Sequence, residues 1–163
     1  MPANYVAVNA KNIGLNEYEG HSLYDMFYNN KIDTNTHIVT GDNHSLSKLN
    51  FVVLDSIDVD YVPSIKDVRE AADDLYAAQP LDYDTGVLKP KGIIDIECIR
   101  PQRCGVMRVL LSLIIQENTQ SNIIRKLNSH ARCDKLKTAL FEYNSIFKSI
   151  HILNLNDDMR LRR

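Results

Sequence analysis

Residues 1–66 alternate between the hydrophobic periods of strands and helices. Short β-rich runs occur at 5–8, 37–40 and 59–62. Stretches with apolar positions three or four residues apart lie between them, at 17–29 and 45–57. Ser45 is a typical residue for the start of the second of these helices. Strands that alternate with helices are typical of an α/β layer with parallel strands and right-handed crossovers, so we predict such a layer with about three strands.

The pattern changes after residue 66. Residues 67–78 predict a helix or a helical turn, and residues 79–92, with two prolines and two glycines, predict a loop. From Val106 onward, apolar residues recur at helical spacing in three successive stretches, at 106–114, 123–127 and 136–153. We therefore predict a partial α/β core over residues 1–66, followed by an all-α segment within residues 67–163.

Composition narrows the class of protein. The chain has 163 residues, of which 44% are apolar and 25% charged, as expected for one globular domain or a piece of a larger one. The most apolar run, at 106–115, is interrupted by Arg108 and Ser112, whereas a membrane-spanning helix needs about 20 apolar residues. The first ten residues also lack the basic start and long apolar core of a signal peptide. We therefore expect a cytoplasmic location and no membrane partner.

Charge is divided unevenly along the chain. Residues 1–90 carry 6 basic and 14 acidic side chains, a net charge of −8, and residues 91–163 carry 13 basic and 7 acidic ones, a net charge of +6. A basic half can contact phosphate. The candidate phosphate contacts cluster at a predicted helix–helix junction, and they are Arg125, Lys126, Arg132, Lys135 and Lys137. A solvated helix face explains the same residues equally well.

The best single candidate for chemistry is Asp42. It follows the apolar pair at 38–39 and precedes a predicted helix. Strand ends in α/β sheets face the crevice where ligands bind, and a carboxylate there suits a hard cation such as Mg²⁺. His44, two residues on, could orient a phosphate or a carboxylate. The alternative is that Asp42, like Asn43 and Ser45, caps the following helix.

A weaker group consists of Glu17, Glu19 and His21, which could form one edge of a metal site. The alternative is the polar first turn of a helix, where acidic side chains complement the helix dipole. The sequence contains no G-x-S-x-G, P-loop or G-x-G-x-x-G motif, and so nucleophilic catalysis has no signature here.

Short motifs follow one another in order along the chain. They are N-I-G-L-N-E-Y-E-G-H at 12–21, Y-D at 24–25, Y-N-N at 28–30, T-G-D-N-H-S at 40–45, N-F at 50–51 and P-S-I-K-D at 63–67. Further pieces lie at 126–129, 139–143 and 156–163. Together these motifs resemble the catalytic region of transposases from class II bacterial transposons of the Tn-three type. In that family, the stretch similar to 40–45 carries Asp-x-His-Gly/Ser and is followed by Asn-Phe.

The resemblance implies a DDE transposase with a ribonuclease-H-like core. Three carboxylates in such a core hold two Mg²⁺ (or Mn²⁺) ions, which activate water or a DNA 3′-hydroxyl for in-line attack on a phosphodiester. The implied activity is nicking at transposon ends and joining to target DNA in replicative transposition. Asp42 corresponds to the second catalytic aspartate and thus to a metal ligand. Residues 67–163 correspond to the helical insertion that leads to the third carboxylate. The implied partners are DNA and other copies of the transposase, at the bacterial nucleoid.

The sequence also departs from the family pattern. The first catalytic aspartate is expected on a strand before Met1, and the third carboxylate, a glutamate, on a helix after Arg163. Ser64 stands where the family usually has arginine, and Arg103 and Cys104 stand where Trp-Asp is expected. We therefore expect an internal fragment that does not catalyse strand transfer by itself, because two ions bind only in the complete active site. We also expect poor solubility, because such a fragment exposes a sheet edge and apolar helix faces that the missing parts would cover.

Two other interpretations stay open. The chain could be a truncated, non-catalytic copy that binds DNA or full-length transposase, or a small metal-binding α/β protein centred on Asp42 and His44. Salt-sensitive DNA binding would favour either transposase-derived interpretation. Tight Mg²⁺ or Mn²⁺ binding by this chain alone would favour the metal-binding protein, because one carboxylate of an incomplete triad binds a metal ion poorly.

Overall fold

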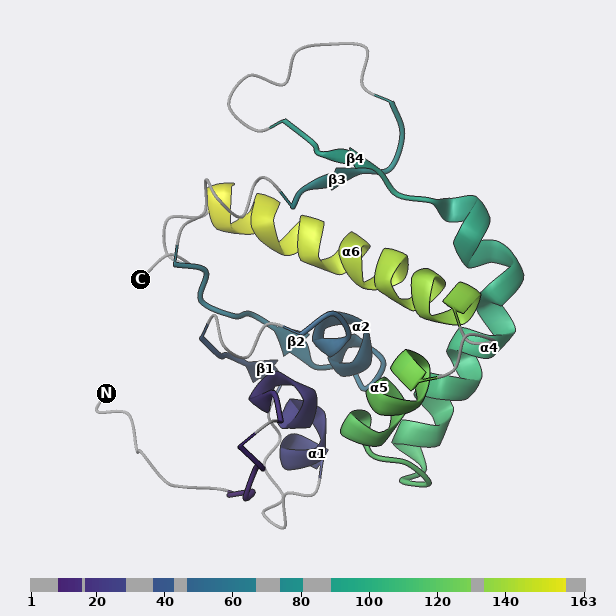
Figure 1. Cartoon of the computed structure of the whole chain (residues 1–163). Helices are drawn as coiled ribbons and strands as arrows, with labels where there is room; N and C mark the ends of the chain where they lie inside the picture. Colours follow the sequence, from purple (N-terminus) through teal and green to yellow (C-terminus); the bar gives the residue numbers. More distant parts are fainter. Residues whose placement is uncertain are drawn as a thin grey trace.

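The computed structural model describes residues 9–15, 17–28, 37–42, 47–66, 74–80, 89–129 and 134–157. Helices dominate this part of the chain, and the strands are short (Figure 1). The elements, in order, are η1 Glu19–Ser22, α1 Leu23–Tyr28, β1 Ile38–Val39, α2 Asn50–Asp55, β2 Asp60–Tyr61, β3 Tyr76–Ala77, β4 Gly92–Ile93, α4 Ile96–Ile114, α5 Gln120–Ser129 and α6 Asp134–Asp157. This mixture of helices and strands is consistent with the predicted α/β class.

The first strand pair is parallel, as predicted. β1 and β2 are parallel, with Ile38 opposite Asp60 and Val39 opposite Tyr61, and α2 lies between them in the chain. The helix expected at 45–57 is shorter in the structure, because α2 begins only at Asn50. The strand expected at 5–8 and the expected cap Ser45 lie outside the described residues.

Two predicted boundaries in the second half are wrong. Tyr76–Ala77, expected to be helical, form β3, which pairs in parallel with β4 at Gly92–Ile93; the segment after residue 66 is therefore not all-α. α4 begins at Ile96, ten residues before Val106. The side chain of Asp95 caps this helix by accepting a hydrogen bond of 2.9 Å from the Cys98 amide. Pro101 lies inside α4, and a proline usually signals a helix end, which hid the early start.

The main hydrophobic cluster draws on residues from both sides of residue 66. α6 packs against both α4 and α2, and β3 lies against α6 on the side away from α2 (Figure 1). Leu54 of α2 and Leu140 of α6 have no exposed surface, and Leu113 of α4 is 1% exposed. These leucines belong to the same cluster as Tyr24, Tyr61 and Ile123. The strand-bearing and helical segments are thus held together by shared apolar burial.

A buried polar network fixes three helices relative to one another. The side chain of Gln120, at the start of α5, has no exposed surface. Its Oε1 accepts a hydrogen bond of 3.1 Å from the Tyr24 amide in α1, and its Nε2 donates one of 2.5 Å to Asn50 Oδ1 in α2. The Gln120 amide donates to the Asp25 carboxylate at 2.9 Å. Because buried polar groups require partners, these bonds set how α1, α2 and α5 meet.

Candidate functional site

Asp42 lies just beyond the carboxyl end of β1. The pairing of this strand with the β2 segment continues past the regular strand, since the Ser64 amide donates to the Gly41 carbonyl at 2.7 Å. Asp42 is the next residue, and it is exposed. α2 begins eight residues later, and its N-cap, Leu49, makes no side-chain capping bond. Asp42 therefore does not cap α2, and it occupies the strand-end position at which α/β folds present ligand-binding groups.

Tyr18 is surrounded by the acidic and imidazole groups of the candidate site. Burial is the main cause that raises the pKa of the Tyr18 hydroxyl, and the negative charges of Glu19 and Asp42 raise it further. The ring of His21 meets the Tyr18 ring edge-on, with 5.1 Å between centroids. Burial lowers the pKa of His21, so its imidazole is neutral at pH 7. The fold thus brings Glu19 and His21 to the neighbourhood of Asp42.

Glu17, the third member of that weaker group, has a local structural role. One of its carboxylate oxygens accepts a hydrogen bond of 3.3 Å from the Gly14 amide, and its own amide donates to the Gly14 carbonyl at 2.9 Å. Glu17 therefore closes a turn ahead of η1. His44 lies outside the described residues.

The chemistry of Asp42 fits one ligand of a hard divalent cation. An exposed carboxylate offers the oxygen atoms that Mg²⁺ prefers, and Mg²⁺ commonly binds through one or two carboxylates and keeps several waters. Within the described ranges, no group of three or more His, Cys, Asp or Glu side chains is arranged to hold a metal ion. Among the described residues, Asp42 thus suits the role of one metal ligand.

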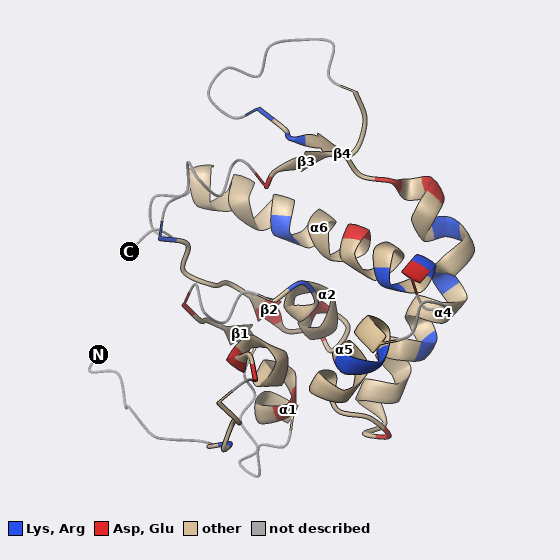
Figure 2. Ribbon diagram, viewed as in Figure 1, with Lys and Arg blue, Asp and Glu red and all other residues tan. Residues whose placement is uncertain are grey.

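Of the five predicted phosphate contacts, four lie within the described residues, two on α5 and two on α6. Basic residues are spread along α4, α5 and α6 (Figure 2). Arg125 and Lys126 are exposed on α5, each hydrogen-bonded to a nearby asparagine side chain. Lys135 and Lys137 lie in the first turn of α6, and Lys137 also lines a pocket. Arg132 lies outside the described residues.

That pocket, here called the Tyr18 pocket, has a volume of about 390 Å³. It is formed by η1, by α5, by α6 and by the residues that precede α2. Its lining includes Tyr18, His21, Asn128 and Lys137. Tyr18, which lines this pocket, is also the phenol whose pKa the charge of Asp42 helps to raise.

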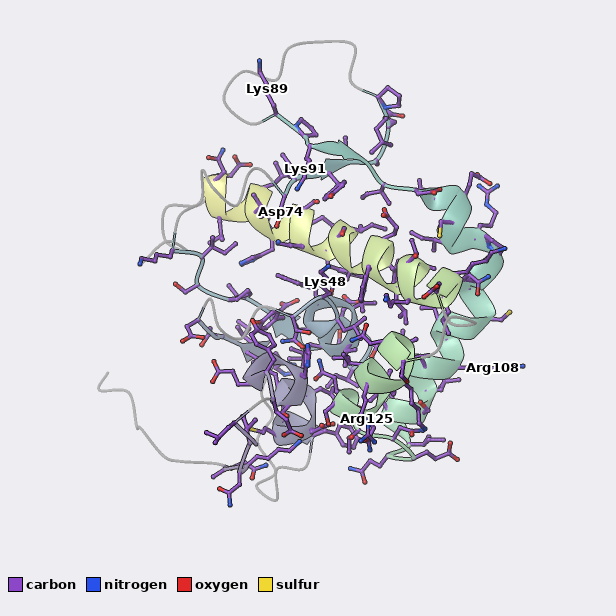
Figure 3. All side chains as sticks on the ribbon, in the orientation of Figure 1. Lys48, Asp74, Lys89, Lys91, Arg108 and Arg125 are labelled. Carbon is purple, nitrogen blue, oxygen red and sulfur yellow. The ribbon has the colours of Figure 1, made fainter. Side chains whose placement is uncertain are left out.

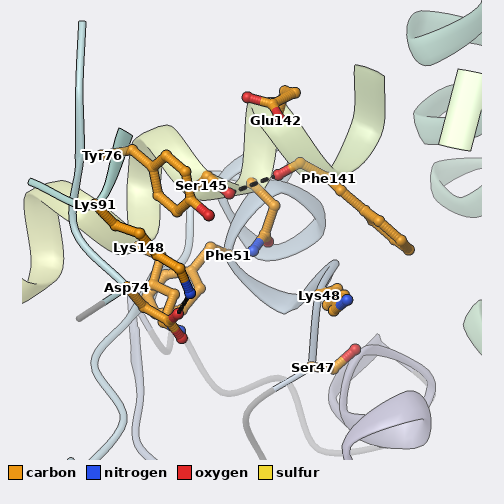
Figure 4. Close-up of a pocket in the computed structure, with 11 residues that line it drawn as sticks. Ser47, Lys48, Phe51, Asp74, Tyr76, Lys91, Phe141, Glu142, Ser145 and Lys148 are labelled. Carbon is orange, nitrogen blue, oxygen red and sulfur yellow. Dashed lines mark hydrogen bonds and ion pairs between the residues drawn. The ribbon is translucent and has the colours of Figure 1, made fainter. Parts of the chain in front are cut away.

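A second pocket, here called the Asp74 pocket, has a volume of about 470 Å³. It is formed by α2, α6 and the β3–β4 pair, and its lining includes Asp74, Tyr76, Lys91 and Lys148 (Figure 4). Asp74 accepts from Lys148 Nζ at 2.7 Å and from Lys91 Nζ at 3.4 Å. The hydrogen bond from Lys148 is the main cause that lowers the pKa of Asp74, so this carboxylate is ionised at neutral pH.

The two pockets adjoin, because Ser47, Lys48 and Phe141 line both. Lys48 Nζ lies 5.1 Å from the centroid of the Phe141 ring, a cation–π contact. Ser47 is 8% exposed, and its Oγ is buried without a hydrogen-bond partner within the described part of the chain. An unpaired buried hydroxyl is unusual, and here it lies at the wall that the pockets share.

Sequence reasoning missed three lysines of these pockets. Lys48, Lys91 and Lys148 are far apart in the chain, and no motif or period links them. Lys48, Asp74 and Lys91 lie around α2 and α6, whereas Arg125 lies on α5 (Figure 3). Only the packing of the β3–β4 pair against α6 brings Lys91 and Lys148 to the same carboxylate.

Comparison with known proteins gives one match. A family model described as the Tn3 transposase DDE domain matches residues 2–163. Neither the curated proteins nor the solved structures contain a match. Among the helices of the described ranges, none has the length and apolar content needed to cross a membrane.

Proposed function

The chain belongs to the family of Tn3 transposase DDE domains, and from this we propose that it is catalytic-region sequence of an enzyme that cleaves DNA at transposon ends and joins it to target DNA. The family match supports transposition as the process and DNA as the substrate. The observation that carries the assignment of a site is the exposed Asp42 at the carboxyl end of β1. The motif that contains Asp42 is also the one most similar to the family's second catalytic aspartate.

In this proposal, Asp42 is a ligand of Mg²⁺ or Mn²⁺. When bound, such ions lower the pKa of an attacking water and stabilise charge on the phosphodiester oxygens. Asp42 would hold the ion from the strand end, and the Tyr18 hydroxyl and the neutral His21 imidazole would provide uncharged hydrogen-bonding groups nearby. A ribonuclease-H-like core within residues 1–66 and a helical insertion within 67–163 are part of the proposal, and the β1–α2–β2 crossover and the helices α4 to α6 support them.

We further propose that this 163-residue chain does not catalyse strand transfer by itself. Asp42 supplies one carboxylate, and two-metal catalysis needs several, so the complete site draws on groups beyond those described. DNA and other copies of the transposase are the proposed partners, in the bacterial cytoplasm at the nucleoid. Co-purification with a full-length transposase, without nicking activity, would instead identify a non-catalytic partner protein.

The role of Asp42 is tested in a complete transposase of the family whose matching segment is replaced by residues 1–163. Asp42→Asn keeps the shape of the side chain but removes its negative charge. We expect transposition in cells to fall to background with Asp42→Asn and to stay unchanged with Asp60→Asn, which alters an exposed carboxylate on β2. Transposition that persists with Asp42→Asn would refute the assignment.

The activity of the chain alone is tested separately. The purified protein is incubated with supercoiled plasmid in Mg²⁺ and in Mn²⁺, and nicked circles are measured on gels. We expect no nicking above a protein-free control. Metal-dependent nicking that Asp42→Asn abolishes would contradict the proposed inactivity but support the role of Asp42.

A further inference from the structure

We propose that the Tyr18 pocket and the Asp74 pocket together form one groove that holds a DNA strand in single-stranded form. The strand would run from the neighbourhood of Asp42 to the ion pairs between Asp74 and its two lysines, Lys91 and Lys148. This inference rests on the proposed function and adds to it a path for the substrate and the residues that contact it. The combined site is called the lysine groove below.

The first argument is continuity. The Tyr18 pocket begins at the phenol that lies within electrostatic range of Asp42. Three residues, Ser47, Lys48 and Phe141, line both pockets, so the second begins where the first ends. The groove therefore leads from Tyr18 past the residues before α2 and along α6 to the β3–β4 pair.

The second argument is the charge of the lining. Lys137 lies in the first pocket, Lys48 at the shared wall, and Lys91 and Lys148 in the second pocket. Two acidic side chains, Asp74 and Glu142, line the second pocket together with three of these four lysines. The groove thus keeps an excess of positive charge in a chain whose net charge is −2. Each ammonium carries three N–H donors, so a lysine bound to Asp74 has further donors for phosphate oxygens.

The third argument is the presence of aromatic rings along the same path. Tyr18, Phe141 and Tyr76 line the groove from one pocket to the other. Alternating lysines and rings are typical of grooves for single strands, where lysines follow the backbone and rings stack on bases without selecting their sequence. A base that stacks on Phe141 would replace the Lys48 ammonium on that ring and free it for a phosphate. The unpaired Ser47 hydroxyl offers a hydrogen bond at the same place.

The size of the pockets favours one strand over a duplex. Volumes of about 390 and 470 Å³ lie in the range that encloses small ligands, which suits about one nucleotide in each pocket. A double helix is too wide to enter and would instead meet the exposed α5 face, where Arg125 and Lys126 lie. The two surfaces therefore give different predictions for single-stranded and duplex DNA.

The test measures the binding of a fluorescent twelve-nucleotide single strand, and of the matching duplex, by anisotropy over a range of salt concentrations. Lys48→Gln and Lys137→Gln each remove one proposed phosphate contact without touching the Asp74 ion pairs. Each is expected to weaken single-strand binding roughly fourfold at 0.15 M salt and to lower the slope of log K against log salt by about 0.7. Phe141→Leu should weaken binding by a similar factor without changing the slope, because stacking releases no counterions. Arg108→Gln, which changes an exposed basic side chain on α4 outside the groove lining, serves as the matched control and should leave single-strand binding unchanged.

The outcomes separate this inference from the proposed function. If the unmodified chain binds the single strand but Lys48→Gln and Lys137→Gln bind it equally well, the lysine groove is wrong and the transposase assignment stands. Single-strand binding that weakens with Arg125→Gln or Lys126→Gln, and not with the groove variants, would also overturn the groove. Failure of the unmodified chain to bind either form of DNA would count against both proposals. Thermal melts of every variant show whether a loss of binding reflects a loss of folding.

Discussion

Replacing Gln120 with alanine is expected to lower the free energy of unfolding by about 3 kcal/mol. The side chain is fully buried and bonds the Tyr24 amide at 3.1 Å and Asn50 Oδ1 at 2.5 Å. Alanine removes both bonds, so the Tyr24 amide on α1 loses the Gln120 acceptor and Asn50 Oδ1 on α2 loses the Gln120 donor. Each buried polar group that loses its partner costs about 1–3 kcal/mol, so two such groups cost about 2–6 kcal/mol. Water that enters the vacated space moves the value toward the lower half of this range.

The assay is urea unfolding followed by circular dichroism at 222 nm, with the free energy and its dependence on urea fitted together. Gln79→Ala is the matched control, because Gln79 is exposed, and its effect should stay within about 0.5 kcal/mol. Asn50→Ala combined with Gln120→Ala should cost less than the sum of the single changes, since the two side chains share one bond. A loss below about 1 kcal/mol for Gln120→Ala, with an unchanged urea dependence, would refute the idea that this network holds the three helices together.

Two further predictions concern pH and solubility. The His151 imidazole is buried, its Nε2 lies 2.9 Å from the Pro63 carbonyl oxygen, and burial lowers its pKa below the usual 6.5. As the pH falls, the unfolded chain therefore takes up this proton before the folded chain does. The contribution of His151 to the free energy of unfolding should be full above about pH 6.5 and should decline as the pH falls toward the lowered pKa. His151→Gln should flatten this part of the curve of urea midpoint against pH, and an unaltered curve would contradict the assignment. On α4, Met107 and Leu111 are 51% and 55% exposed on one face, followed by Ile115 at 59%. Leu111→Gln should raise the saturating concentration measured after centrifugation without lowering the melting temperature, whereas equal solubility would show that this face does not limit it.

The local parts of the fold were predictable from the sequence, and the non-local parts were not. The β1–α2–β2 crossover follows from a change of hydrophobic period within about 25 residues, and Asp42 follows from its place after β1. β3 was missed because Tyr76–Ala77 become a strand only by pairing with Gly92–Ile93. The start of α4 was missed because Pro101 reads as a helix end, although the Asp95 cap marks the true one.

The candidate site divides in the same way. Asp42 belongs to a local motif, and that motif carried both its chemical interpretation and the family resemblance. The lysine groove depends on contacts such as Lys148 with Asp74, which are 74 residues apart, and on a cation–π contact between α6 and a residue before α2. Neither contact produces a regular spacing of residues that can be recognised in a single sequence. Among the basic residues predicted to contact phosphate, Lys137 lines the groove. Clustering along the chain could not single it out, because clustering does not determine which helix face a side chain occupies.

The shared hydrophobic cluster ties the evolution of the helical segment to that of the strand-bearing one. Leu54, Leu113 and Leu140 lie on three different helices, and all three are buried in it. In a close-packed interior, a change of volume at one such position strains or empties the space around the others. Among related sequences, substitutions at these positions are therefore expected to occur as compensating sets. A segment that carries Asp42 cannot acquire the helices of a distant relative unless its own packing face changes with them.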